Sequence, residues 1–190
     1  MASSALAPVV VGLSGASGMP YALDLLRALK AAEVEVHLVA TRGALEVLRA
    51  ETELEPEALF ALAHRHYPVG DLSAPIASGS FRTLGMVVVP ASQTTLAKIA
   101  AGIADNLLTR AAFVHLKERR PLVLVPRETP LPLPALRAML AAAEAGAVIL
   151  PASPGFYHRP RAIEDLIRFV TQRILDHLGV ALDWAPRWGD

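Results

Sequence analysis

Short apolar runs rich in valine alternate along this chain with longer stretches of helical periodicity. Five such runs predict strands buried on both faces, at residues 8–13, 34–41, 85–90, 121–126 and 147–151. Apolar positions at i, i+3 and i+4 predict helices at residues 21–31, 94–101, 106–118, 134–145 and 163–178. Strand followed by helix, repeated, predicts an α/β fold in which helices cover both faces of a mostly parallel sheet.

The composition indicates one domain with a substantial core. The chain has 190 residues, of which 53% are hydrophobic and 19% charged. We therefore expect a single domain over 1–190, with a ragged N-terminus at 1–7 and a C-terminal tail at 180–190. The segment 73–80 is expected to be a long irregular loop, and such loops are often functional.

Charge and cysteine content narrow the range of partners. Lys plus Arg number 18, Asp plus Glu number 18, and the net charge is +0, which argues against a nucleic-acid partner. The absence of cysteine excludes disulfides, thiolate nucleophiles and cysteine metal sites, and it suits a cytoplasmic enzyme. No apolar run reaches the ~18 residues of a membrane span, and the N-terminus lacks the basic region of a signal peptide.

Polar or glycine-rich segments follow four of the predicted strands. They are residues 14–18, 41–42, 91–95 and 127–128. Ligands of open α/β sheets bind beyond the carboxyl ends of the strands, so these segments are expected to surround one crevice. Polar strand ends reaching solvent would explain one or two of them, but explain four less well.

The first of these segments contains a glycine loop. Gly12, Gly15 and Gly18 have the spacing G-x-x-G-x-x-G, whereas the dinucleotide fingerprint is G-x-G-x-x-G. The second strand ends in Thr41 rather than in the acid that binds a ribose, and the loop lacks the lysine of a P-loop. The backbone N–H groups of the loop and the hydroxyls of Ser14 and Ser17 suit a mononucleotide such as FMN.

Longer motifs accompany the loop: "ASGSF" at 77–81, "PASQTTLAKIAAG" at 90–102, "LKERRPLVLVPRETPL" at 116–131, "GFYHRP" at 155–160 and "LDWAPRW" at 182–188. With these motifs the chain resembles the UbiX family of flavin prenyltransferases from about residue 9 to residue 188. The resemblance implies a Rossmann-like, flavodoxin-like three-layer domain that assembles into a dodecamer. It also implies that reduced FMN and dimethylallyl phosphate react at flavin N5 and then C6. The prenylated FMN would serve a UbiD-type decarboxylase, and no metal is required.

The resemblance also implies roles for individual residues. The expected flavin-binding residues are Gly15, Ala16, Ser17, Thr41, Ser92, Gln93, Thr94, Thr95 and Arg127. The expected residues around the prenyl phosphate are Arg110, Lys117, Tyr157, Arg173 and Trp188. The expected catalytic groups are Ser17, Glu51 and Glu128. The chain departs from the family pattern at Ala91, where cysteine is frequent, and at Phe113, where aspartate is usual.

Without the resemblance, several of these residues have plainer interpretations. Arg127 and Glu128 would form a structural ion pair, and the charge run at 117–120 would be a solvated helix end. Trp184 and Trp188 would anchor a subunit interface. His64 and His66 would face solvent, and the histidine spacing predicts no metal site.

Two other functions stay open at this level. One is an FMN-dependent decarboxylase of the cysteine decarboxylase clan. Such enzymes have a histidine where this chain has "ASGSF" and a Pro-x-Met-Asn motif where it has "PRETPL". The other is a noncatalytic FMN carrier, which would have no use for a prenyl phosphate site.

Overall fold

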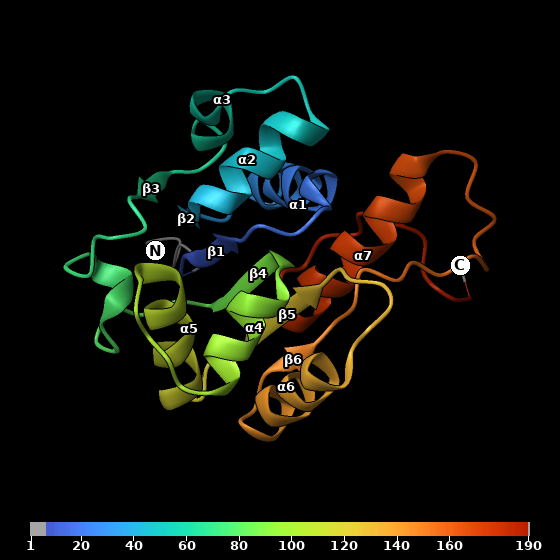
Figure 1. Cartoon of the computed structure of the whole chain (residues 1–190). Coiled ribbons are helices and arrows are strands. Elements are labelled where there is room, and N and C mark those ends of the chain that lie inside the picture. Colours follow the sequence, from blue (N-terminus) through green and yellow to red (C-terminus); the bar gives the residue numbers. More distant parts are fainter. Residues whose placement is uncertain (1–6, 190) are drawn as a thin grey trace.

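One parallel sheet organises the computed structural model, which describes residues 7–189 (Figure 1). Its strands lie in the order β3-β2-β1-β4-β5-β6. They are β1 (Val9–Leu13), β2 (Val36–Ala40), β3 (Arg65–Tyr67), β4 (Gly85–Ala91), β5 (Leu122–Pro126) and β6 (Val148–Ile149). This order confirms the Rossmann-like α/β class, and it reverses between β1 and β4. The ragged start predicted for 1–7 lies outside the described residues except for Ala7.

Helices cover both faces of this sheet. On one face lie α1 (Met19–Ala31), α2 (Arg42–Glu51) and α7 (Ile163–Leu178), whose buried residues belong to one core cluster. On the other face lie α4 (Gln93–Ala100), α5 (Leu107–Lys117) and α6 (Leu133–Glu144). The three predicted layers are therefore confirmed.

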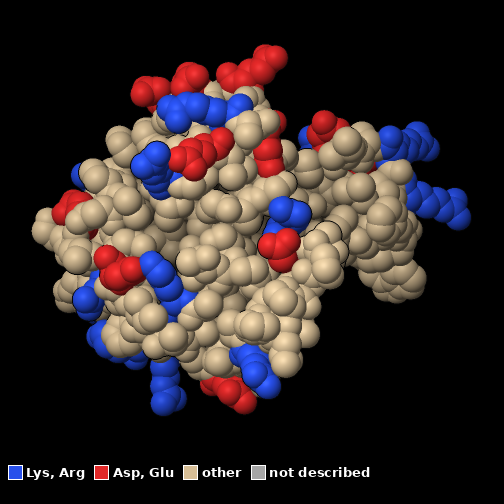
Figure 2. Space-filling model, in the orientation of Figure 1, with Lys and Arg blue, Asp and Glu red and all other residues tan. Residues whose placement is uncertain are grey.

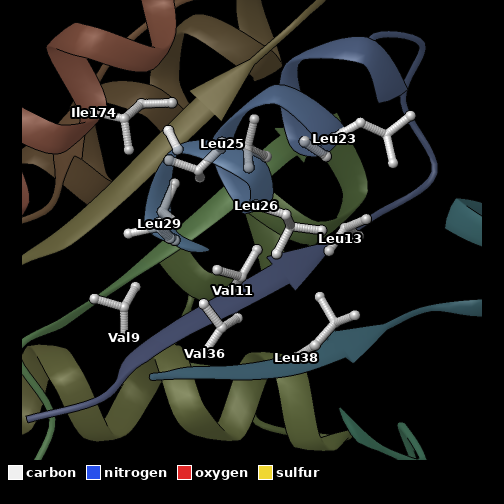
Figure 3. Close-up of a cluster of buried hydrophobic side chains, with 14 of the residues drawn as sticks. Val9, Val11, Leu13, Leu23, Leu25, Leu26, Leu29, Val36, Leu38 and Ile174 are labelled. Atoms are coloured by element: carbon white, nitrogen blue, oxygen red, sulfur yellow. The ribbon is translucent and has the colours of Figure 1, made fainter. Parts of the chain in front are cut away.

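The central strands contribute alternate side chains to two hydrophobic cores, one on each face of the sheet. In β1, Val9, Val11 and Leu13 point toward the leucines of α1, among them Leu26, as Figure 3 shows. Val10 belongs to the core cluster on the opposite face. Successive side chains of a strand point to opposite faces, so a run of valine and leucine serves both layers at once.

Some elements differ from the sequence prediction. The helices α2 and α3 (Pro56–Phe60), the 3₁₀ turn Pro75–Ala77 and the strand β3 were not predicted. Strand β3 has only three residues with the sequence RHY, so it carries no apolar run. The expectation that every strand is buried on both faces is wrong for β6, which is half-buried because it pairs with β5 along one side.

On the face shown in Figure 2, positive and negative side chains are interspersed on a mostly uncharged surface. Within residues 7–189, no helix is both long and apolar enough to cross a membrane. In the same range, no group of three or more His, Asp and Glu side chains is arranged to hold a metal ion. His64 and His66 are exposed, as predicted.

Candidate functional site

The carboxyl ends of β1, β2, β4 and β5 bring four polar segments to one edge of the sheet. The segment 14–18 follows β1, Thr41 follows β2, Ser92 follows β4 and Arg127 follows β5. Direct bonds join them: the Arg127 Nε donates to the Ser17 carbonyl at 3.0 Å, and the Thr41 N–H donates to the end of β1. The convergence predicted from the strand ends is confirmed at the point where the strand order reverses.

Ser14 links two strands instead of facing this edge. Its hydroxyl donates to the Pro90 carbonyl at 2.9 Å and accepts from the Ser92 N–H at 2.7 Å. The side chain is fully buried. The expectation that the Ser14 hydroxyl approaches a ligand is therefore wrong, because its two hydrogen bonds join the end of β1 to the end of β4.

Glu51 occupies the N-terminus of α1 from the last turn of α2. Its carboxylate accepts from the N–H groups of Gly18 at 2.9 Å and Met19 at 2.8 Å, and from the Ser17 hydroxyl. Partial burial acts to raise the pKa of Glu51, but these hydrogen bonds and the charge of Arg127 outweigh it and lower that pKa. The first amides of α1 are thus already bound by a carboxylate of the chain itself.

The N-terminus of α2 offers amides that the protein leaves open. The Thr41 hydroxyl accepts from the Ala44 N–H at 3.2 Å, whereas the N–H groups of Arg42 and Gly43 have no acceptor within the described part of the chain. A Cβ placed on Gly15 would lie 3.1 Å from the Cα of Gly43. This close approach needs glycine, and it brings the β1 loop against a helix end that suits an anion.

The N-terminus of α4, which follows β4, lies at the same edge of the sheet. The Ser92 hydroxyl accepts from the Thr95 N–H at 3.3 Å and donates to the Thr95 hydroxyl at 3.1 Å. Thr94 is exposed. Both polar atoms of the Gln93 amide are buried without a hydrogen-bond partner among the described residues. A buried amide of this kind is costly unless a ligand satisfies it.

Arg127 and Glu128 line a cavity beyond the ends of β5 and β6. The interpretation as an ion pair is wrong: Arg127 bonds to the Ser17 carbonyl, and the Glu128 carboxylate accepts from the Thr129 N–H at 3.1 Å. Glu128 is exposed. The remaining lining residues are Pro126, Thr129, Leu131, Met139, Pro151, Ala152 and Ser153.

Three residues expected at the prenyl phosphate line a second cavity. They are Arg173 of α7, Trp188 of the C-terminal segment, and Tyr157. The Trp188 ring packs edge-on against the Tyr157 ring, with centroids 4.9 Å apart. Arg173 donates to Asp176 at 2.8 Å and stays half-exposed. Ser153, which lines the cavity beside Arg127, lies four residues before Tyr157 in the chain.

Lys117 and Arg110, which both lie on α5, line neither of these two cavities. Helix α5 runs against the strand direction, so Lys117 at its end lies near Gly79 and the start of β5, at the amino edge of the sheet. Lys117 forms an ion pair with Glu118. Arg110 lies nearer the start of α5 and is half-buried. The neighbouring Arg120 is not simply solvated, because it donates to the Phe81 and Gly79 carbonyls.

Comparisons with known proteins agree with this arrangement. The family model Flavoprotein matches residues 3–174. The flavin prenyltransferase UbiX of Deinococcus radiodurans is 55% identical over 180 residues, which are 95% of this chain and 92% of that protein. The chain belongs to the UbiX flavin prenyltransferase family.

Solved structures of UbiX-type proteins superpose on nearly the whole chain. A crystal structure of AnUbiX (PadA1) in complex with FMN and dimethylallyl pyrophosphate has a TM-score of 0.95 and 44% identity, covering 97% of this chain and 98% of that one. A dodecameric FMN-dependent UbiX-like decarboxylase from Escherichia coli O157:H7 has a TM-score of 0.92 and 43% identity, covering 96% and 100%.

The residues of this UbiX family member fit FMN at the carboxyl edge of the sheet. The unpaired Gln93 amide, the open amides at the start of α2 and the glycine contact between Gly15 and Gly43 are each suited to a polar, phosphate-bearing ligand. Ala16 and Ser17 line the same loop, half-buried and exposed respectively. Thr95 is set apart from this group, since it is buried and its hydroxyl bonds to Ser92.

Sequence reasoning missed the polar residues that hold the second cavity of this UbiX family member. Asp24, Gln172, Asp176 and Arg187 bond across α1, α7 and the C-terminal segment. One signal was present: Gln172 interrupts the apolar positions of α7, and it is buried at 3% exposure. A buried amide on a helix indicates partners that the sequence does not identify.

Proposed function

We propose that this protein is a flavin prenyltransferase that transfers the dimethylallyl group of dimethylallyl phosphate to N5 and C6 of reduced FMN. The observation that carries the proposal is the presence of two sites in one chain: a carboxyl-edge site that suits FMN, and a cavity lined by Arg173, Tyr157 and Trp188. Reduced FMN, when bound, supplies the nucleophilic nitrogen and carbon.

The leaving phosphate requires positive charge and hydrogen-bond donors. Arg173 has a guanidinium with one bond to Asp176, and its remaining N–H groups are open to a phosphate oxygen. Tyr157 lines the same cavity and carries a hydroxyl that can donate to a phosphate oxygen. These groups stabilise the negative charge that grows on the phosphate as its bond to carbon breaks.

The allylic group must be aligned and kept from water. Tyr157 and Trp188 meet edge to face, and Tyr157 also packs on Phe169 at 5.7 Å between centroids. Aromatic faces stabilise positive charge that develops on the allylic carbon. Tyr157 and Trp188 are exposed in the single subunit, so they keep water from the allylic group only once the donor or another copy covers them.

Proton transfer is assigned to Ser17, Glu51 and Glu128. The Ser17 hydroxyl donates to Glu51, and the lowered pKa of Glu51 keeps this carboxylate ionised, so that it orients the hydroxyl as a proton relay. Glu128 faces the cavity beside Arg127, where it can remove the proton that must leave when the second bond forms. Ser17 relays protons at the flavin loop.

A mass measurement tests this function. Reduced FMN is incubated with the protein and dimethylallyl phosphate without oxygen, and the flavin is then analysed by mass spectrometry. We expect a mass gain equal to one prenyl group. An unchanged flavin that is nevertheless tightly bound contradicts the proposal and favours an FMN carrier.

We also propose that the protein forms a homo-oligomer, and specifically a dodecamer. Lys117 lies at the amino edge of the sheet, and Glu128 follows the carboxyl end of β5. Lys117 can therefore serve a prenyl phosphate near Glu128 only from another copy. The UbiX-like relative of Escherichia coli O157:H7 is dodecameric. Arg110, on the same helix, supports the phosphate from that copy.

Subunit mixing tests the shared site. Lys117→Ala and Glu128→Gln are each expected to be nearly inactive, whereas oligomers reassembled from both in equal amounts recover about one quarter of wild-type activity. The quarter arises because each mixed site needs Lys117 from one variant and Glu128 from the other. Mixing Lys117→Ala with Lys117→Arg controls for reassembly. If mixing restores nothing while both variants bind FMN, Lys117 and Glu128 do not reach one site from two different copies.

Two further parts of the proposal concern the cell. The product serves a UbiD-type decarboxylase, which is tested by adding the reaction product to the cofactor-free decarboxylase and measuring decarboxylation.

The protein works in the cytoplasm, a location that suits its cysteine-free sequence and is tested by cell fractionation.

A further inference from the structure

The C-terminal segment 180–188 has no helix or strand, yet one side chain of α7 fixes its backbone. The Gln172 Oε1 accepts from the N–H groups of Trp184 and Ala185, and its Nε2 donates to the Leu182 carbonyl at 3.0 Å. The Trp184 indole also donates to Asp24 of α1 at 2.9 Å. The segment is thus anchored up to residue 185.

A second anchor holds the part of the segment that reaches the cavity. Arg187 donates from Nη1 and Nη2 to the two oxygens of Asp176, at 3.2 and 2.9 Å, and from Nε to Asp183 at 3.1 Å. The same Asp176 carboxylate accepts from Arg173 at 2.8 Å. One carboxylate of α7 therefore holds two guanidiniums, of which one belongs to the tail and one to the cavity.

Trp188 depends on this second anchor. It is 79% exposed, so burial in the core does not hold it. Its ring contact is with Tyr157, and the residue before it is Arg187. Chain ends are poorly ordered unless something ties them down. The bidentate bond between Arg187 and Asp176 fixes the backbone one residue before the indole and so keeps it against Tyr157.

Arg187 also affects how Arg173 can meet a phosphate. A phosphate that binds Arg173 competes with Asp176 for that guanidinium. Without Arg187, this competition would leave the part-buried carboxylate with only the neutral Gln172 amide, at 3.0 Å, and no opposite charge, which is unfavourable. Because Arg187 stays bound to Asp176, Arg173 is released to the phosphate at lower cost.

We propose that Asp176 and Arg187 are positioning residues of the prenyl-donor cavity: their ion pair holds Trp188 against Tyr157 and frees Arg173 for the donor phosphate. This inference rests on the proposed function, since that function makes the cavity a donor site. Neither residue needs to touch the donor. Their contribution is to fix the groups that do.

Calorimetric titration of the protein loaded with oxidised FMN measures donor affinity without turnover. Arg187→Ala is expected to raise the Kd for dimethylallyl phosphate about tenfold, with the Kd for FMN unchanged. In turnover, its KM for the donor rises and its kcat falls as well, because Trp188 also stabilises the charge that develops on the allylic carbon. Arg161→Ala, which removes an exposed guanidinium before α7, is the matched control and leaves both constants unchanged.

A double-mutant cycle tests whether Arg187 acts through Trp188. Arg187→Ala is expected to weaken donor binding less in the Trp188→Ala background than in the wild type, because only its effect through Arg173 is left. Fully additive losses would overturn the inference, as would an unchanged Kd in Arg187→Ala or an equal loss of FMN affinity. Arg187→Lys keeps the charge but not the paired N–H geometry, so it should fall between wild type and alanine, and it replaces the alanine variant if that does not fold.

The two proposals fail in different ways. If wild-type protein binds dimethylallyl phosphate but leaves the mass of reduced FMN unchanged, the proposed function fails, and the Kd of Arg187→Ala still decides the positioning role. If wild type prenylates FMN and Arg187→Ala matches it in Kd and KM, the positioning role alone fails. A wild-type protein that does not bind the donor overturns both.

Discussion

Replacing Glu51 with glutamine is expected to lower the rate of FMN prenylation by about 10²- to 10³-fold. The Glu51 carboxylate accepts from the Ser17 hydroxyl and from the Gly18 and Met19 N–H groups. An amide keeps one acceptor oxygen, places N–H groups against donors, and cannot take a proton. Single-turnover measurement of the flavin mass under anaerobic conditions gives the rate, and FMN titration gives the affinity, which we expect to change little.

Glu46→Gln is the matched control for this variant. Glu46 lies on the same helix, is exposed, and pairs with Arg42 at 2.9 Å instead of with the flavin loop. It should have wild-type activity. A Glu51→Gln enzyme with wild-type turnover would remove Glu51 from the proton pathway and leave it the role of capping α1.

The same variant should change the acid stability of the fold. The pKa of Glu51 is lower in the folded protein than its ordinary value. Its contribution to stability is therefore fully present above the unfolded-state pKa and is lost as the pH falls through the folded-state pKa. Denaturant unfolding at a series of pH values should show wild type and Glu51→Gln converging at acid pH. A difference that stays constant with pH would contradict this assignment.

Ser14→Ala is expected to lower the free energy of unfolding by about 2 to 3 kcal/mol, because it leaves buried polar groups without a partner. The lost hydroxyl accepts from the Ser92 N–H and donates to the Pro90 carbonyl, at the junction of β1 and β4. For a chain of this size the loss corresponds to roughly 4–12 °C in Tm. Thermal and urea unfolding measure it.

Ser17→Ala provides the opposite pattern from the same loop. Ser17 is exposed, and its hydroxyl donates to Glu51. This variant should unfold close to wild type but lose most of its prenylation activity. If Ser14→Ala keeps wild-type stability and loses FMN affinity instead, Ser14 faces the ligand and its hydroxyl does not join β1 to β4.

Local patterns were enough to predict the central strands and most of the helices. The valine-rich stretch now seen as β1 is buried on both faces, and a sequence of that kind has no other stable place in a small domain. The edge elements were harder. Strand β3 is polar, so it is a strand because β2 offers it a partner. Helix α2 was missed, although Thr41 is a good N-cap residue.

The candidate site divides in the same way. The sequence motifs named Ser17, Glu51 and Arg127, and the fold brings these three together by hydrogen bonds. The motifs also named Lys117, which the fold places at the opposite edge of the sheet. Residue identity therefore predicted the chemistry, whereas the direction of α5 relative to the strands decided where that lysine lies.

The sequence by itself determined the α/β class, the crevice at the strand ends and the kind of ligand that the glycine loop accepts. These follow from periodicity and from residue types close together in the chain. The tertiary structure alone decided that Ser14 joins two strands, that Glu51 caps α1, and that Asp176 holds Arg187 beside Trp188. Each of these depends on hydrogen bonds between residues far apart in sequence, and local pattern carries no information about such partners.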